Sequence, residues 1–287
     1  MLSYRHAFHA GNHADIFKHS VLSLIVRYVT KKPKPFSYID SHAGAGIYNL
    51  ESDEAKKTGE AAKGIEHLLS LSDIPESLQN YVEICRSLYE SDRTYPGSPE
   101  IVRTLSRSED QLILMELHTA EIENLKDNMG GDPRIHIHHR DGYAGLNALC
   151  PPDPKRGFAL IDPSYETVSD YSKTAETIIR IQKKWPVGTI ILWYPIVPRR
   201  INELITLKDR LYTAGIPNIL CTELMVHPLP DVIDEETEWG LAGSGLLILN
   251  PPWKLAEELH EVLPWLAQTL GENENGAWSV EWLSNPS

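Results

Sequence analysis

The sequence of 287 residues contains only three cysteines, and their placement excludes two common kinds of covalent or metal cross-link. Cys85, Cys150 and Cys221 lie far apart, are odd in number and form no CxxC pair. Neither a disulfide framework nor a thiolate zinc site is therefore expected. We predict no metal site, and the reducing cytoplasm is the expected compartment.

Long apolar runs are also missing from the sequence. No stretch approaches the roughly 18 apolar residues that a membrane-spanning helix needs, and residues 1–19 are too polar for a signal peptide. Internal repeats and low-complexity tracts are absent as well. With 41% hydrophobic residues, the chain is expected to be a cytosolic globular protein of one large domain or two modest ones.

Basic residues are fewer than acidic ones, since 27 Lys and Arg stand against 40 Asp and Glu, and the net charge is −13. By itself this balance favours a small-molecule enzyme over a protein that binds a polyanion. Residues 1–35, here called the basic arm, differ because their net charge is +5, which leaves −18 on the remaining residues. This arm predicts a local patch that meets polyanions, and the alternative is an ordinary solvated helix flank.

The pattern of apolar residues predicts alternating helices and strands. From Asn12 to Thr30 they recur every three or four residues, with Asn12 and Asp15 at the N-cap and N3 positions, which predicts an amphipathic helix. Seven short β-rich runs then alternate with helical stretches, which predicts an α/β Rossmann-like fold with a seven-stranded sheet. The runs are 37–40, 112–117, 134–139, 158–162, 189–194, 218–226 and 245–250.

The first predicted strand leads into a glycine-rich turn, in which Gly44 and Gly46 would let the backbone approach a nucleotide-like ligand. An acid at the end of the second strand normally follows about 20 residues later and binds the ribose. Here that acid is Glu116, which lies 72 residues after Gly44, so about 50 residues are inserted. Residues 47–96 fit the insertion, because they read as two amphipathic helices and no strand.

These features predict three parts of the chain. The insertion is expected to form a helical subdomain, after which Ser98 is expected to cap the next helix. The parts are 1–46 (basic arm, first helix and first strand), 47–96 (helical insertion) and 97–287 (the remainder of the Rossmann-like domain).

Two further acids follow predicted strands. Asp141, next to Gly142, ends the third strand, and Asp162 ends the fourth as the first residue of a D-P-x-Y turn. A glycine loop followed by these acids is the order typical of an S-adenosylmethionine methyltransferase that acts on an amino nitrogen. The glycine loop would admit the methionine part, Glu116 would accept from the ribose hydroxyls, and Asp141 would accept from the adenine amine of the cofactor.

The D-P-x-Y turn suits the methylation of a nucleobase amine, a poor nucleophile whose lone pair is delocalised into the ring. The Asp162 carboxylate and the Pro163 carbonyl can each accept one N–H, which favours a pyramidal nitrogen with its lone pair facing the methyl group. Tyr165 can stack on the flipped base. Alignment and preorganised electrostatics would supply the rate enhancement, with deprotonation after transfer. The alternative is a plain strand-to-loop turn.

A second segment, Asn250-Pro251-Pro252-Trp253, matches the usual [N/D]-P-P-aromatic pattern better than Asp162-Pro163-Ser164-Tyr165 does. It closes the last predicted strand, which runs antiparallel in methyltransferase sheets. Its end would then point away from the edge where ligands bind. We interpret it as a structural turn.

These motifs resemble those of the RlmJ-type 23S ribosomal RNA adenine-N(6) methyltransferases over nearly the whole chain. The resemblance implies a Rossmann-like methyltransferase with a small helical insertion, which transfers a methyl group from S-adenosylmethionine to an adenine in domain V of 23S rRNA. The segments that carry it are LSYRHAFHAGNHADIFKH, DSHAGAGIY, KTGE, YPGSP, MELH, RDGY, DPSYE, LWYPIV and GLLILNPPWKL.

The resemblance also implies roles for individual residues. Tyr4 matches a position that faces the substrate RNA, with His6 and Lys18 as nearby candidates. Asp162 fills the position of the catalytic acceptor. Residue types alone select Glu116, Asp141 and Asp162 as cofactor contacts, but they do not select the two histidines or the serine. The implied cofactor contacts are His19, His42, Ser98, Glu116, Asp141, Gly142 and Asp162.

One position departs from the family pattern, which has D-P-P-Y where this chain has Ser164. The second proline would fix φ near −65° and remove a donor, so Ser164 loosens the turn and adds an N–H that needs a partner. Because Asp162, Pro163 and Tyr165 are kept, we expect activity to survive at a reduced level.

Other functions remain open at this point. DNA adenine and protein glutamine methyltransferases use the same turn, and a noncatalytic RNA- or metal-binding protein is a rival prompted by the histidines near residues 6–19 and 136–139. The expected partner is 23S rRNA, free or in an early assembly intermediate. We expect no membrane, no obligate protein partner and a monomer.

Overall fold

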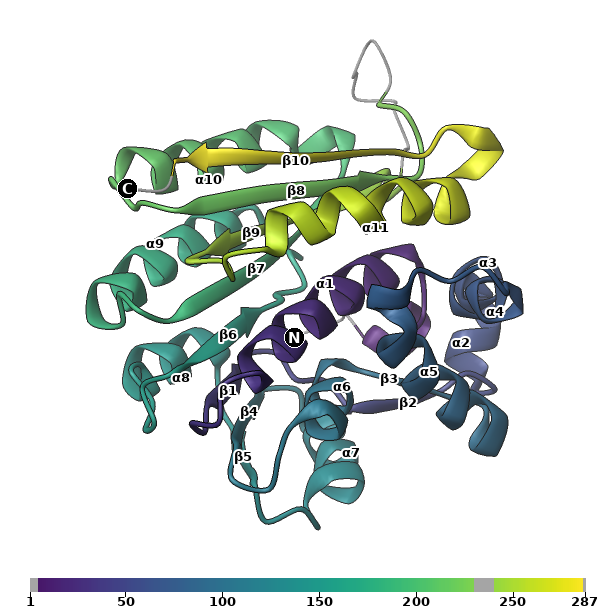
Figure 1. Ribbon diagram of the computed structural model, residues 1–287, viewed down its shortest axis with the longest axis horizontal. Helices are drawn as coiled ribbons and strands as arrows, with labels where there is room; N and C mark the ends of the chain where they lie inside the picture. The colour runs from purple at the N-terminus through teal and green to yellow at the C-terminus, as the bar shows by residue number, and fades with distance from the viewer. Residues whose placement is uncertain (1–4, 230–239, 286–287) are drawn as a thin grey trace.

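The computed structural model describes residues 5–229 and 240–285 (Figure 1). These residues form one eight-stranded mixed sheet in the order β10-β8-β9-β7-β6-β1-β4-β5, and the predicted α/β Rossmann-like class is confirmed. All seven predicted strands are present. The strands are β1 (Ser37–Asp40), β4 (Gln111–Glu116), β5 (Ile135–His139), β6 (Gly157–Ile161), β7 (Thr189–Ile196), β8 (Ile219–Met225), β9 (Gly243–Leu249) and β10 (Ala277–Ser284).

The eighth strand, β10, corrects the predicted count of seven. It pairs antiparallel with β8 at the edge of the sheet. Its residues are half-buried or exposed, and Trp278 and Trp282 are 37% and 39% exposed. An edge strand of this kind lacks the continuous apolar run that marks the buried strands.

Helices cover both faces of the sheet and enclose two hydrophobic cores (Figure 1). Residues 14–26 of α1 are all buried, so the predicted helix from Asn12 to Thr30 is a central element of the fold. Its N-cap is Asn12, whose side chain accepts the Asp15 N–H as predicted. The helices are α1 (His13–Thr30), α6 (Ser98–Leu105), α7 (Thr119–Met129) and α11 (Leu255–Leu270) on one face, and α8 (Gly142–Leu149), α9 (Val168–Lys184) and α10 (Ile201–Thr213) on the other.

Strand direction fixes where the site must lie. Strands β7, β6, β1, β4 and β5 run parallel, so their carboxyl ends share one edge of the sheet. From β1 the chain first builds outward through β4 and β5, and then crosses to the other side of β1 to add β6 and β7. Ligands of such sheets bind where the strand order reverses, beside the carboxyl end of β1.

The Asn250–Trp253 turn lies at the opposite edge of the sheet. Strand β9 runs antiparallel to both β7 and β8, which confirms the expected direction, although β10 and not β9 is the last strand. The Asn250 side-chain amide donates to the carbonyls of Pro186 and Gly188 at 2.8 and 3.0 Å. These bonds support the interpretation of this segment as a structural turn.

Residues 47–96 hold short helices, but the prediction of no strand there is wrong. The segment begins with β2 (Ile47–Asn49) and ends with β3 (Thr94–Pro96), which pair antiparallel as a small second sheet. The predicted first helix is broken at Gly64, where a Cβ would lie 2.0 Å from the Gly11 carbonyl oxygen. The helices are α2 (Asp53–Thr58), α3 (Glu60–Lys63), α4 (Ile65–Ser70) and α5 (Gln79–Asp92).

The basic arm does not gather its charge beside the cavity described below. Helix α1 spans about 27 Å at 1.5 Å per residue, and Lys31, Lys32 and Lys34 follow its far end, at the opposite edge of the sheet. Closer to the site, Arg5 pairs with Glu54 at 2.9 Å. The basic residues of the arm therefore do not form one patch, and the prediction of such a patch is wrong.

Candidate active site

A cavity of about 1240 Å³ lies at the carboxyl ends of the parallel strands. Typical sites for drug-sized ligands measure roughly 300–1,000 Å³, so a cofactor and a nucleoside could be held together. Tyr4 lies outside the described residues, and Gly46 does not line the cavity. The sequence-selected residues that line it are His6, Lys18, His19, His42, Gly44, Ser98, Glu116, Asp141, Gly142, Asp162, Pro163 and Tyr165.

Glu116, at the end of β4, holds the glycine loop in place. Its carboxylate oxygens accept the Gly44 N–H at 2.9 Å and the His118 N–H at 2.6 Å. Each oxygen keeps a lone pair for a ribose hydroxyl. Gly44 has a φ of +59°, and a Cβ there would lie 1.9 Å from the Tyr48 hydroxyl. The Tyr48 hydroxyl therefore fills the space that a side chain at position 44 would need, whereas Gly46 packs against α7.

Asp141 and Gly142 form the next part of the wall, where β5 leads into α8. Asp141 caps α8 by accepting the Ala144 N–H at 2.8 Å and pairs with Lys173 at 3.1 Å. Burial acts to raise the pKa of Asp141, but the bonds from Ala144 and Lys173 lower it below its usual value. A Cβ on Gly142 would lie 2.0 Å from the Ser41 carbonyl oxygen, so only glycine fits there.

The two histidines implied by the resemblance line the cavity as neutral side chains. His19 is buried, and its Nδ1 lies 2.7 Å from the Tyr95 hydroxyl. The His42 ring meets Tyr143 edge-on at 5.3 Å between centroids. Burial lowers the pKa of both imidazoles, so neither carries charge near neutral pH. They can offer hydrogen bonds without repelling a cationic cofactor.

Ser98 does not cap α6 as expected, because Gly97 is the N-cap and no side-chain cap forms. Its hydroxyl instead donates to Asp40 at 2.6 Å, and the Tyr38 hydroxyl donates to the same oxygen at 2.5 Å. Asp40 is fully buried, and burial raises its pKa to about 6. Sequence reasoning missed Asp40, although an acid directly before a glycine loop was a usable signal.

The D-P-x-Y turn follows β6 and meets two aromatic side chains. Tyr165 adopts a φ of +50°, and its hydroxyl donates to the Trp193 carbonyl oxygen at 3.0 Å. Its ring lies 4.6 Å from Tyr171 between centroids. Trp193 also lines the cavity, and its buried indole N–H makes no hydrogen bond within the described part of the chain. Sequence reasoning did not select Trp193, which lies in the segment LWYPIV.

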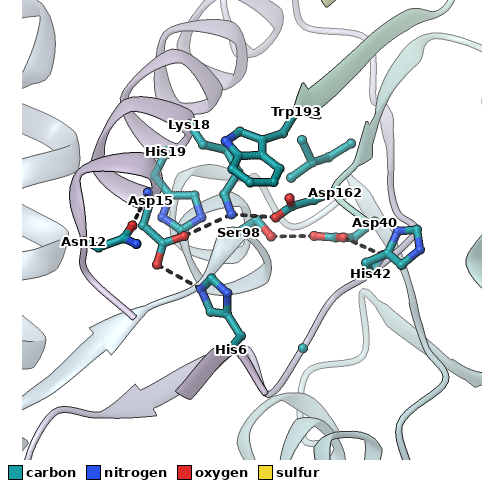
Figure 2. A network of polar contacts seen from close by, with 12 residues as sticks. His6, Asn12, Asp15, Lys18, His19, Asp40, His42, Ser98, Asp162 and Trp193 are labelled. Carbon is teal, nitrogen blue, oxygen red and sulfur yellow. Dashed lines mark hydrogen bonds and ion pairs between the residues drawn. The ribbon is translucent and has the colours of Figure 1, made fainter. Parts of the chain in front are cut away.

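A chain of polar contacts runs through the cavity wall from His6 to Asp162 (Figure 2). His6 Nε2 lies 2.9 Å from Asp15, and Lys18 Nζ lies 3.0 Å from Asp15 and 2.5 Å from Asp162. Burial acts to lower the pKa of Lys18, but the two carboxylates raise it above its usual value. The structure thus joins two predicted residues, Lys18 and Asp162, and adds Asp15.

Other kinds of site find no support in the described ranges. Among residues 5–229 and 240–285, no group of three or more His, Cys, Asp or Glu side chains is placed to hold a metal ion. No helix in these ranges has the length and apolar character needed to cross a membrane. His6 and His9 are each bonded to a carboxylate, Asp15 and Glu60.

The fold and the cavity together identify the class of protein. A glycine loop after β1, an acid at the end of β4 and a D-P-x-Y turn after β6 surround one cavity at the point of strand reversal. The glycine loop and the lone pairs that Glu116 keeps free beside it fit a nucleoside-containing cofactor. These are the features of a Rossmann-like methyltransferase.

Comparison with known proteins gives the family. The profile of the family described as ribosomal RNA large subunit methyltransferase D, RlmJ, matches residues 33–284. Ribosomal RNA large subunit methyltransferase J of Escherichia coli is 41% identical over 285 residues, and that of Haemophilus influenzae is 40% identical over 287, each covering 99% of both chains. A crystal structure of a Legionella pneumophila protein superposes with a TM-score of 0.86 at 30% identity, covering 96% of this chain and 98% of that one. The chain belongs to the RlmJ family of ribosomal RNA methyltransferases, which confirms the resemblance and the enzyme class.

Proposed function

We propose that the protein transfers a methyl group from S-adenosylmethionine to the N6 amine of an adenine in domain V of 23S rRNA. The observation that carries the proposal is the position of Asp162 and Pro163, which line a cavity large enough for both cofactor and base. Calorimetric titration with S-adenosylmethionine, followed by transfer of a labelled methyl group to 23S rRNA, tests it. Cofactor binding without methylation would contradict the proposal.

Residues at the ends of β1, β4 and β5 would hold the cofactor, which supplies an electrophilic methyl group. Gly44 and Glu116 are placed for its methionine part and ribose, and Asp141 with Gly142 for its adenine. Support comes from the lone pairs left on Glu116 and from the position of Asp141 and Gly142 in the cavity wall. His19, His42 and Ser98 complete the wall of this part of the cavity.

The target base would enter beside the D-P-x-Y turn. Asp162 and the Pro163 carbonyl each accept one N–H of the amine, so that its lone pair faces the methyl group, and Tyr165 stacks on the ring. The cofactor would supply its methyl group to this lone pair, and the methylated nitrogen would then lose its extra proton to solvent. Tyr4, His6 and Lys18 are proposed on the RNA side, and Trp193 adds an aromatic wall.

A stiffer D-P-x-Y turn is expected to raise the rate of methylation. In a Ser164→Pro variant, we expect the single-turnover methylation rate to rise about 2- to 5-fold, because proline removes unproductive backbone conformations. Rapid-quench measurement with excess enzyme gives this rate, and Ser164→Ala separates loss of the hydroxyl from stiffness. An unchanged rate in Ser164→Pro would mean that the stiffness of the turn is irrelevant.

RNA affinity is expected to depend on cations at the cavity rim and not on the lysines of the basic arm. Lys63, Lys173 and Arg200 pair with acids, whereas exposed Arg199 forms no ion pair with any described residue. We expect Arg199→Ala to lower the slope of log affinity against log salt by about 0.7, the value for one contact to single-stranded phosphate. Fluorescence anisotropy with a labelled domain V transcript measures the slope.

The matched control is Lys32→Ala, because Lys32 is exposed at the opposite edge of the sheet. Its affinity and salt slope should equal those of the wild type. The reverse pattern, with loss in Lys32→Ala and none in Arg199→Ala, would restore the basic arm as the RNA-binding surface.

A further inference from the structure

Lys18 is a buried cation held between two carboxylates. Its side chain is 5% exposed, and the side chain of Asp15 is 1% exposed. Lys18 Nζ lies 2.5 Å from Asp162 Oδ2 and 3.0 Å from Asp15 Oδ1, and the indole of Trp193 covers it at 5.8 Å (Figure 2). A buried ammonium must keep an anionic partner at every stage of a reaction, since an unpaired buried charge is very costly.

The short contact with Asp162 conflicts with the proposed chemistry. An ammonium hydrogen bonded to a carboxylate oxygen withdraws negative charge from it and makes it a weaker acceptor. The Asp162 carboxylate is the group expected to accept an N–H of the target amine. The carboxylate accepts the amine more strongly if Lys18 loosens its contact with Asp162 Oδ2, and the ammonium then needs another anion in reach.

Asp15 is the anion in reach, and it is fixed in place. Its Oδ2 accepts the Gly11 N–H at 3.0 Å and lies 2.9 Å from His6 Nε2. Its backbone N–H donates to Asn12 in the first turn of α1. Because Lys18 follows one turn later on the same helix, a small rotation of its flexible side chain moves the ammonium between the two carboxylates.

We propose that Asp15 is a positioning residue that holds Lys18 while Asp162 accepts the target amine. Asp15 lines the cavity, and in this proposal it acts only through Lys18, without contact to the base or the cofactor. Asp15 keeps the Lys18 ammonium paired whether or not the ammonium also contacts Asp162. The Asp162 carboxylate can then accept the amine without leaving an unpaired buried cation. The inference rests on the proposed function, because it concerns the same turn and the same amine.

The test uses Asp15→Asn, which preserves shape and the oxygen that accepts the Gly11 N–H but removes the charge. Lys18 then has only Asp162 as an anionic partner. The single-turnover rate of 23S rRNA methylation should fall about 30- to 100-fold. The dissociation constant for S-adenosylmethionine, measured by calorimetry, should stay within about 2-fold of the wild type, because Asp15 acts on the base side.

Two further variants separate positioning from general structure. Asp110 is also buried at 1% exposure and bonded to a backbone N–H, that of Phe36, but it lies at the other edge of the sheet. Asp110→Asn should lower the melting temperature without changing the rate. The double variant Asp15→Asn with Lys18→Met removes both buried charges of α1, and we expect it to fold even if the single variant does not. Its rate should equal that of Lys18→Met alone, because Asp15 acts through Lys18.

The outcomes are distinguishable. If the wild type does not methylate rRNA, the proposed function and this inference both fail. If the wild type methylates and Asp15→Asn does so at an unchanged rate, only the inference fails. It also fails if the double variant is more than about 3-fold slower than Lys18→Met, since Asp15 would then act independently.

Discussion

Replacing Asp162 with alanine should reduce the rate of methyl transfer to 23S rRNA by about 10³-fold. In the proposed mechanism the carboxylate is the charged acceptor for the target amine, and one preorganised group of this kind contributes about 10² to 10³ in rate. The fold should survive, because Lys18 keeps Asp15 as an ion-pair partner at 3.0 Å. Single-turnover kinetics with labelled S-adenosylmethionine measure the effect, and calorimetry checks that the cofactor still binds.

Asp162→Asn is the matched variant. It keeps a side-chain oxygen that accepts an N–H but loses the negative charge, so its rate should lie between those of wild type and Asp162→Ala. If Asp162→Ala methylates within about 10-fold of the wild type while binding cofactor normally, the D-P-x-Y turn has no catalytic role and is only a strand-to-loop connection.

Replacing Glu116 with alanine should weaken S-adenosylmethionine binding by about 100-fold, because the two hydrogen bonds proposed from ribose hydroxyls to this charged acceptor would be lost. The variant also frees the Gly44 and His118 N–H groups that Glu116 holds at 2.9 and 2.6 Å. Calorimetric titration measures the dissociation constant, and saturating cofactor should restore most of the methylation rate.

Glu123→Ala is the control for this prediction. Glu123 is an exposed acid on α7 that pairs with Lys126 on the surface. Its removal should leave the dissociation constant unchanged. Equal cofactor affinity in Glu116→Ala and the wild type would show that the acid after β4 does not bind the ribose, and the cofactor would have to lie elsewhere in the cavity.

Local patterns predicted the buried parts of the fold well. Strand β6 is predicted by its continuous apolar run, and the start of α1 by Asn12, because each signal depends on neighbouring residues only. Strand β10 could not be found in the same way. It is half-exposed, and it exists because β8 offers a partner more than 50 residues earlier in the chain.

The site shows the same division. Glu116 and Asp141 could be placed because they end strands whose order is predictable. The contact between Lys18 and Asp162 joins residues 144 positions apart, and no local pattern carries it. The two carboxylates lie around Lys18 because the fold brings α1 next to Asp162, the residue that follows β6.

The prediction of one basic patch from the charge of residues 1–35 was wrong because the count ignores where the side chains lie. The sum over residues 1–35 treats six basic residues as one patch, but α1 separates them along its whole length. Lys31 and Lys34 are at the opposite edge of the sheet from Lys18, which is itself neutralised by two acids. Composition therefore predicted the amount of positive charge correctly but not its position.

The most direct test of the central claim is identification of the methylated product. Purified protein is incubated with S-adenosylmethionine labelled in the methyl group in three parallel reactions. These contain 23S rRNA, double-stranded DNA or a protein release factor. The RNA is then digested to nucleosides. We expect label in N6-methyladenosine from 23S rRNA alone. Label in the DNA or the protein, or in a different nucleoside, would contradict it.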